Sequence, residues 1–510
     1  MKVHKPPVIF HPFLFAIFPA LSIVSDHIRF LTFNITILGL SIVTILVTLA
    51  GLLLLRLARV DRQKAGIIVS LALLLFFSYG HLYYFLSRTF SGFDLRHRHL
   101  LLLWIVLAVI LGFLSKKADK HLATYTNFLN IMGISLVTLS CVQIAGFEIA
   151  TRNVWQSGRE FESAEAGVEN FHDTPDVYYL IFDTYASTST LRDAYEHDNG
   201  EFIAYLHERG FYVADESFSN YSVTALSLAS SLNMDYIDRL SPDYGANGTN
   251  WEYELPKQMI ENNNVMWYLK SKGYQFIFLG SGRGVTQGNR YADREIKCGY
   301  VDETVGRIIE STLIWPAADQ LQVMANDDRN QRLCVFATLA DMPNIEGPKF
   351  VFAHILAPHQ PFLFDADGDP VREAPSDLEH TKRAYVNQLV FINQKIQEMV
   401  DAILSSSEVE PIIVLQGDTG PPYGFEPGAA LENPTEDIYR QNMRILNAYY
   451  LPKNGPRSLY PGISPVNTFR MIFNLYFAAD IPLLKDKSYF LLVDQDVRRF
   501  LDVTESVDFR

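Results

Sequence analysis

Five long apolar runs dominate the first 150 residues, and short polar stretches separate them. Each run is close to the roughly 20 residues that a helix needs to cross a bilayer. The runs cover residues 8–24, 30–55, 65–87, 99–115 and 125–147. Buried helices of a large soluble protein are the alternative, but apolar runs this long and this clustered favour membrane spans. We therefore predict a transmembrane helical domain over residues 1–150.

The first run also has the basic flank of a cleaved signal peptide, because Lys2 and Lys5 precede it. Pro12 and Pro19 interrupt this run, and further apolar runs follow it directly. We therefore expect the first helix to be retained as a membrane span.

Basic residues gather in alternate loops between the apolar runs. Positively charged loops tend to remain in the cytoplasm. Arg88, Arg96 and Arg98, in the loop between the third and fourth runs, would then lie outside despite their charge. An odd number of spans places the chain after about residue 150 outside the cytoplasm. The loops that we assign to the cytoplasm contain Arg56, Arg59, Arg62, Lys64, Lys116, Lys117 and Lys120.

The pattern changes after a polar linker at residues 151–174, where short apolar runs begin to alternate with amphipathic segments. Such alternation is typical of an α/β domain, which we expect to cover residues 175–510. Residues 382–404 have apolar positions at helical spacing and are expected to pack on the sheet. The expected strands are residues 177–182, 275–279, 349–355, 411–415 and 448–451, with a further helix at 199–209.

Charge and cysteine content limit the partners of this second part. Residues 1–150 contain 13 Lys and Arg against 5 Asp and Glu, whereas the remaining 360 residues contain 30 against 52. An acidic domain argues against nucleic acid as a partner, because duplex binding depends on basic side chains. Cys298 and Cys334 form a disulfide or remain two buried thiols, and the sequence favours neither.

Polar residues with metal-binding or catalytic chemistry follow three of the expected strands. Asp183 follows the first strand, His354 and His359 lie at the end of the strand near residue 350, and Asp418 follows the strand near residue 411. In open α/β sheets, ligands bind beyond the carboxyl ends of the strands. One such Asp can be a helix cap or a turn residue. Several strand ends of this kind in one chain favour a metal site.

Four segments resemble the alkaline-phosphatase superfamily, and in particular its membrane-anchored sulfatase-like and phosphoethanolamine- or phosphoglycerol-transferase members. The segment SNYSVTALSLASSLN at 219–233, which contains Thr224, resembles the nucleophile segment of lipid A phosphoethanolamine transferases. VYYLIFD, ending at Asp183, resembles the first metal-ligand strand. HILAPHQP at 354–361 resembles the His-x4-His-x-Pro loop, and GDTG at 417–420 resembles Asp-His-Gly.

This resemblance implies a bundle of about five transmembrane helices followed by an alkaline-phosphatase-like α/β/α sandwich. The protein would be integral to a bacterial inner membrane, with its soluble domain in the periplasm. It would act on phosphate or sulfate esters of lipid headgroups or envelope glycans. The resemblance gives no oligomeric state.

The resemblance also assigns roles to residues. One divalent metal ion, which could be zinc, calcium, magnesium or manganese, would neutralise the ester and lower the pKa of a bound threonine hydroxyl. Thr224 would be the nucleophile and a metal ligand. His354 or His359 would contact the ester or protonate the leaving group. The further metal ligands would be Asp183, Asp418 and Thr419, and Arg283 and Arg290 would bind the anionic group.

Thr419 departs from the family pattern, which has a histidine at this position. A threonine hydroxyl is a poor zinc ligand and suits calcium or magnesium better. No histidine follows His380 in the sequence. Three alternatives remain open: a site with a harder metal, a weakened enzyme, and a catalytically silent protein that binds anionic lipid or glycan. In the same way, Thr224 could serve only as a helix cap.

Overall fold

A computed structural model describes residues 7–26, 28, 35–90, 95–117, 121–151, 174–240, 254–372, 374–421, 434–453, 455–494 and 497–507. The chain divides into two compact units. The first is Met1–Arg152 together with Tyr300–Asn326, and the second is Asn153–Gly299 together with Asp327–Arg510. Most of the expected linker, residues 152–173, lies outside the described residues.

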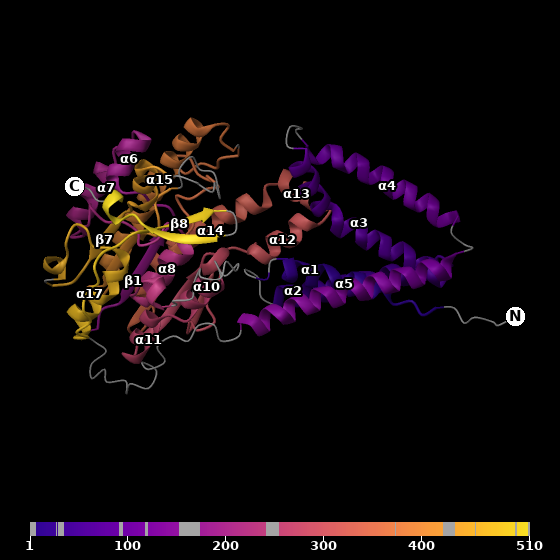
Figure 1. Cartoon of the computed structure of the whole chain (residues 1–510), viewed down its shortest axis with the longest axis horizontal. Helices are drawn as coiled ribbons and strands as arrows, with labels where there is room; N and C mark the ends of the chain where they lie inside the picture. Colours follow the sequence, from indigo (N-terminus) through magenta and orange to yellow (C-terminus); the bar gives the residue numbers. More distant parts are fainter. Residues whose placement is uncertain are drawn as a thin grey trace. The chain divides into compact units, whose positions relative to one another are not determined.

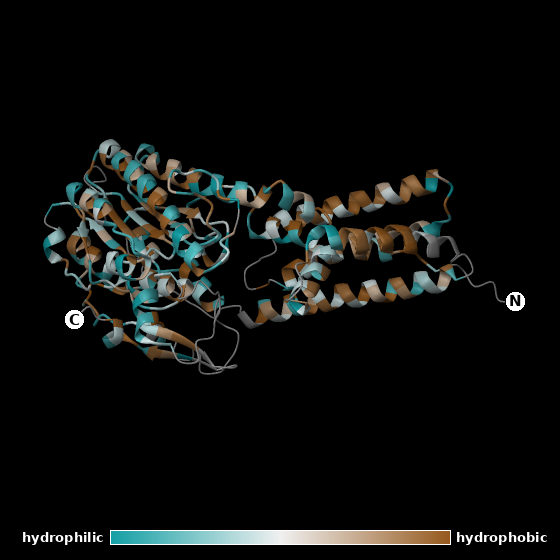
Figure 2. Ribbon diagram, turned by 90° about the horizontal axis from the view of Figure 1, so that it is seen from above, coloured by the Kyte–Doolittle hydropathy of each residue, from teal (hydrophilic) through white to brown (hydrophobic). Residues whose placement is uncertain are grey.

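The first unit contains five long helices, one for each apolar run of the sequence (Figure 1). Three of them are long and apolar enough to cross a membrane, and the other two are shorter apolar helices. Figure 2 shows the apolar character along their length. The prediction of an N-terminal region of about five apolar helices is confirmed. The helices are α1 (His11–Asp26), α2 (Ile35–Leu57), α3 (Arg62–Thr89), α4 (His97–Lys117) and α5 (Leu122–Thr151).

A segment from the second half of the sequence packs inside this first unit. It forms α12 (Glu303–Ser311) and α13 (Trp315–Gln320). A Cβ built on Gly80 of α3 would lie 1.8 Å from the backbone oxygen of Glu310, so the glycine permits this close approach. The Leu313 N–H donates to the Phe76 carbonyl at 2.9 Å. The sequence pattern gave no indication of this arrangement.

The second unit is built on a seven-stranded sheet with the order β2-β7-β6-β1-β5-β3-β4. Neighbouring strands from β6 through β1, β5 and β3 to β4 are parallel, whereas β7 runs antiparallel to both β6 and β2. A two-stranded sheet, β8 with β9, accompanies it. The strands are β1 (Val177–Phe182), β2 (Tyr212–Val213), β3 (Gln275–Gly280), β4 (Arg294–Lys297), β5 (Lys349–Ile355), β6 (Ile412–Gly417), β7 (Asn447–Tyr450), β8 (Tyr489–Asp494) and β9 (Val497–Asp502).

Helices cover both faces of the large sheet, so its central strands β1, β5 and β6 are buried along their whole length. On one face, Tyr179 belongs to a core that also contains α8, α10, α11 and α17. On the other face, Phe182 stacks on Phe336 of α14, and the centroids of the two rings are 6.3 Å apart. The predicted α/β fold class is confirmed. The helices of this unit are α6 (Thr188–Tyr195), α7 (Gly200–Glu208), α8 (Thr224–Asn233), α9 (Ile237–Leu240), α10 (Glu254–Glu261), α11 (Asn264–Ser271), α14 (Val323–Ala340, whose first four residues belong to the first unit), α15 (Leu378–Ser406), α16 (Glu436–Met443), α17 (Pro465–Phe477) and α18 (Thr504–Val507).

Cys298 and Cys334 form a disulfide, which resolves the alternative left open by the sequence. Cys298 follows β4, Cys334 lies in α14, and the two are 36 residues apart in the sequence. The disulfide therefore joins the chain just before the segment Tyr300–Asn326 to the chain just after it.

Candidate metal centre

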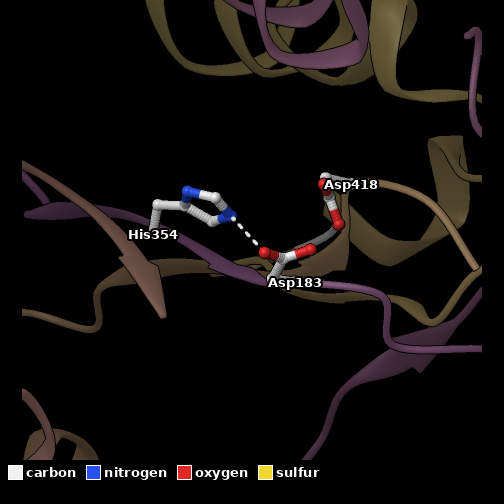
Figure 3. A group of neighbouring side chains, drawn as sticks. All are labelled: Asp183, His354 and Asp418. Atoms are coloured by element: carbon white, nitrogen blue, oxygen red, sulfur yellow. Dashed lines mark ion pairs between the residues drawn. The ribbon is translucent and has the colours of Figure 1, made fainter. Parts of the chain in front are cut away.

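Three potential metal ligands meet at the carboxyl end of the central strands. Strand β1 lies between β5 and β6, and its parallel register pairs Ile181 with His354 and Phe182 with Gly417. Asp183 and Asp418 are the next residues on their strands, so this register places them side by side. One ligand atom from each of Asp183, His354 and Asp418 lies within 4.8 Å of the others (Figure 3).

The ligand atoms of this cluster are buried and incompletely paired. Asp183 is 7% exposed, His354 3% and Asp418 1%. Asp418 Oδ1 accepts a hydrogen bond from the Thr184 N–H at 2.9 Å. Asp183 Oδ1, Asp418 Oδ2 and His354 Nε2 have no hydrogen-bond partner among the described residues. Buried polar atoms are normally satisfied, so these three orphaned atoms fit a bound cation.

The charges of Asp183 and Asp418 also indicate a bound cation. Burial, together with the nearby charge of Asp183, raises the pKa of Asp418 to about 7. The Thr224 side chain and the backbone N–H groups of Thr184 and Thr419 lie nearby and partly oppose this rise. Two carboxylates at one buried position repel each other unless a cation lies between them. The donor set of two carboxylates and one imidazole therefore fits a divalent metal ion.

Thr224 lies next to this cluster, at the first residue of α8. The N-cap position is Val223, which provides no side-chain capping hydrogen bond. Thr224 is therefore not the N-cap of α8, and its side chain lies near enough to Asp418 to lower the pKa of that carboxyl. One turn later, the Ser227 hydroxyl donates to the Asp418 carbonyl at 2.7 Å. The positive end of the α8 dipole therefore lies at the site, where it favours an anion.

His359 occupies the loop after β5. Its backbone N–H donates to the Asp183 carbonyl at 3.1 Å, and its Nδ1 contacts the Gln360 carbonyl. Gln388 of α15 holds this loop, because its Nε2 donates to the carbonyls of Pro358 and His359 at 3.1 and 3.0 Å. The structure therefore places both histidines of the expected motif around Asp183.

Arg283 and Arg290 are each paired with a carboxylate. Arg283 Nη2 donates to both carboxylate oxygens of Asp328, at 2.8 and 3.0 Å. Arg290 forms an ion pair with Glu261, in which Nη2 is 2.7 Å from Oε2. The sequence gave no reason to expect these two acidic partners, which lie on other helices.

Arg332 is a cation near the site that sequence reasoning missed. It is 3% exposed, and it donates to the Leu356 carbonyl at 3.0 Å and to the Asp328 carbonyl at 3.1 Å. Burial lowers its pKa to about 10, and the charge of Asp183 acts in the opposite direction. Arg332 lies on the buried side of α14, and no sequence pattern set it apart from the other basic residues.

Comparisons with known proteins gave similarities among solved structures only. No protein-family model and no curated protein matches the chain. The chain is similar to the C-terminal periplasmic domain of EcEptC from Escherichia coli, with 13% identity, a TM-score of 0.42, and coverage of 64% of this chain and 92% of that domain. That domain is also known in a complex with Zn.

The integral membrane lipooligosaccharide phosphoethanolamine transferase A from Neisseria meningitidis is similar over 91% of this chain and 94% of its own, with 11% identity and a TM-score of 0.40. The putative sulfatase yidJ from Bacteroides fragilis has 13% identity and a TM-score of 0.40, with coverage of 63% and 82%. These matches are phosphoethanolamine transferases and a sulfatase-like protein, the classes that the sequence motifs resemble.

Proposed function

We propose that this chain is a metal-dependent enzyme that transfers or hydrolyses phosphate or sulfate esters of lipid headgroups or envelope glycans. The observation on which the proposal rests is the buried cluster of Asp183, His354 and Asp418, with Thr224 close to Asp418 at the start of α8. The motif resemblance gives the reaction class, and the donor set supports a divalent cation.

A bound divalent ion would supply positive charge against the ester oxygens. Asp418 orients the Thr224 hydroxyl, which lies close enough to lower the pKa of that carboxyl. Thr224 Oγ1 attacks the phosphorus or sulfur atom while its hydroxyl proton passes to Asp418, and the ester bond to the leaving group breaks, so that the group is carried on Thr224. His359 gives a proton to the leaving alkoxide. A water molecule or an acceptor hydroxyl then displaces the group from Thr224 and gives its proton to His359, while Asp418 returns the proton to the Thr224 oxygen.

The membrane unit supports a lipid-linked substrate, because a multi-span anchor keeps the reaction at the bilayer surface. Within that unit, Ile308 packs with Ile23, near the end of α1, and with Ile37, near the start of α2. Trp315 packs on Tyr83, in the last two turns of α3. These helix ends are the ones that the loop charges assign to the periplasmic side. The segment Tyr300–Asn326, which comes from the extramembrane half of the sequence, is at that same end and supports the proposed multi-pass orientation.

The second candidate is a catalytically silent protein that binds anionic lipid or glycan. Thr419 favours it, because the imidazole of the family pattern is missing at this position. The two candidates differ in turnover, whereas both allow a bound anion at the N-terminus of α8.

The deciding experiment measures bound metal and phosphodiester hydrolysis for the full chain in detergent, with bis(p-nitrophenyl) phosphate as substrate. Thr224→Ala should reduce turnover by at least about 10³-fold without loss of fold, and Thr224→Ser should retain part of it. The matched control is Thr435→Ala, because Thr435 is an exposed N-cap with no side-chain capping bond in the described structure. Turnover that survives Thr224→Ala contradicts the proposal, and bound metal without turnover favours the silent protein.

A further inference from the structure

His354 is held in a fixed orientation by a hydrogen bond on the side of its ring away from the carboxylates. It lies in β5 and is buried. Its Nδ1 is 2.7 Å from the Thr286 hydroxyl, which belongs to the short helix η4 (Gly284–Thr286) after β3. Its Nε2 is 3.9 Å from Asp183 Oδ2. Figure 3 shows this nitrogen pointing toward the Asp183 carboxylate. Each nitrogen of the ring therefore has a distinct environment.

A chain of hydrogen bonds behind the ring has only one direction that satisfies every contact. The Arg283 carbonyl can only accept, so the Ser281 hydroxyl, 2.7 Å away, donates its single hydrogen to it. The Ser281 and Thr286 hydroxyls are 2.9 Å apart, and the hydrogen between them must then come from Thr286. Thr286 consequently has none left for His354. The hydrogen between Thr286 and His354 therefore belongs to Nδ1 of the imidazole.

This direction leaves Nε2 with a bare lone pair that faces a carboxylate oxygen. A protonated Nε2 would offer the carboxylate a hydrogen bond, but 3.9 Å is too long for one. Nε2 and Asp183 Oδ1 have no hydrogen-bond partner in the described part of the chain. Two atoms that each bind one ion at roughly 2.0–2.2 Å can be up to about 4.4 Å apart. A single cation can therefore bridge this gap.

We propose that His354 Nε2 is the nitrogen ligand of the metal ion, and that Ser281 and Thr286 are positioning residues that fix its tautomer. This assignment rests on the metal site of the proposed function but does not require catalysis. It gives the site an imidazole from β5, although Thr419 provides none after β6. With two carboxylates and one imidazole, the site selects zinc over calcium or magnesium, which take oxygen ligands.

The assignment is tested by zinc affinity, which is independent of turnover. The full chain is stripped of metal in detergent and titrated with Zn²⁺ against a chromophoric chelator. His354→Ala should weaken zinc binding by at least 100-fold. Thr286→Val, which removes the acceptor for Nδ1–H, should weaken it by about 10–100-fold, and Thr286→Ser should restore it. Calcium should compete with zinc only at concentrations several orders of magnitude higher.

His380→Ala is the matched control, because His380 is an exposed histidine bound to Asp377 at the start of α15. It should leave zinc affinity unchanged. Thermal unfolding of each metal-free variant separates a local loss of binding from a loss of fold. Zinc affinity within twofold of the original chain in a folded His354→Ala variant overturns the assignment. Tight zinc binding that depends on His354, in a chain without turnover, supports the ligand assignment and contradicts only the proposed reaction.

Discussion

Replacing Asp418 by Asn should stabilise the metal-free protein at neutral and alkaline pH, although it removes a proposed metal ligand. The folded-state pKa of Asp418 is raised from 3.8 to about 7, chiefly by burial and then by Asp183. A raised folded-state pKa means that the proton binds the folded state more tightly. Protonation of Asp418 therefore stabilises the folded state fully below pH 3.8, and this stabilisation is lost as pH rises through about 7. At about 1.4 kcal/mol per pH unit, the loss approaches about 4 kcal/mol by pH 8.

An amide at position 418 can still accept the Thr184 N–H bond on Oδ1, but it carries no charge. The metal-free Asp418→Asn variant should therefore lack this part of the pH dependence and unfold at a higher temperature than the original chain at pH 8. At pH 5 the difference between the two should shrink. Added zinc should raise the unfolding temperature of the original chain far more than that of the variant, because only the native state binds the ion.

The assay is thermal unfolding of the full chain in detergent, after chelation, at pH 5, 7 and 8. Asp437→Asn is the matched control, because the Asp437 side chain is 87% exposed and should change stability by less than about 0.5 kcal/mol. The reasoning is refuted if metal-free Asp418→Asn is less stable than the original chain at pH 8. It is equally refuted if the stability difference between the two does not change between pH 5 and pH 8.

Two further predictions concern the segment Tyr300–Asn326. Replacing Cys298 and Cys334 together by Ala should destabilise the second unit by about 2–4 kcal/mol, because the disulfide closes a loop of 36 residues; denaturant unfolding measures this, and an unchanged midpoint contradicts it. Gly80→Ala should disturb the packing of α12 on α3 at a cost of about 1–3 kcal/mol and increase proteolysis within the segment. Gly112→Ala is its control, since a Cβ there meets nothing within 4 Å, and equal proteolysis of both variants refutes the packing argument.

The position of the two carboxylates was predictable from the sequence for a simple physical reason. Strands β1 and β6 are buried on both faces, so they appear as continuous apolar runs, and the first polar residue after each marks the sheet edge. Parallel pairing then brings Asp183 and Asp418 together. Strand pairing does not place Thr224, because its distance from Asp418 depends on the tertiary packing of α8. Only the motif resemblance indicated that Thr224 belongs to the site.

Other features depend on contacts that no local pattern reveals. A histidine inside a strand, such as His354, is indistinguishable by sequence from one satisfied in a core, and only the register with Ile181 places it beside the carboxylates. Arg283 could not be matched with Asp328, which lies 45 residues away on another helix. The segment with α12 and α13 is too polar to be recognised as part of a membrane unit, since its attachment depends on a few side chains such as Trp315.

The segment Tyr300–Asn326 has a practical consequence for isolating the second unit, Asn153–Gly299 with Asp327–Arg510. A fragment that begins near residue 175 would keep Ile308 and Leu313 but lose the apolar neighbours that cover them, so it should aggregate. The two ends of the segment are close together, because a Cβ on Gly299 would lie 2.9 Å from Asp327 Oδ2. Joining Gly299 directly to Asp327 would remove the segment with these exposed apolar side chains and leave both cysteines in place. This shortened chain should be the water-soluble form suited to crystallisation.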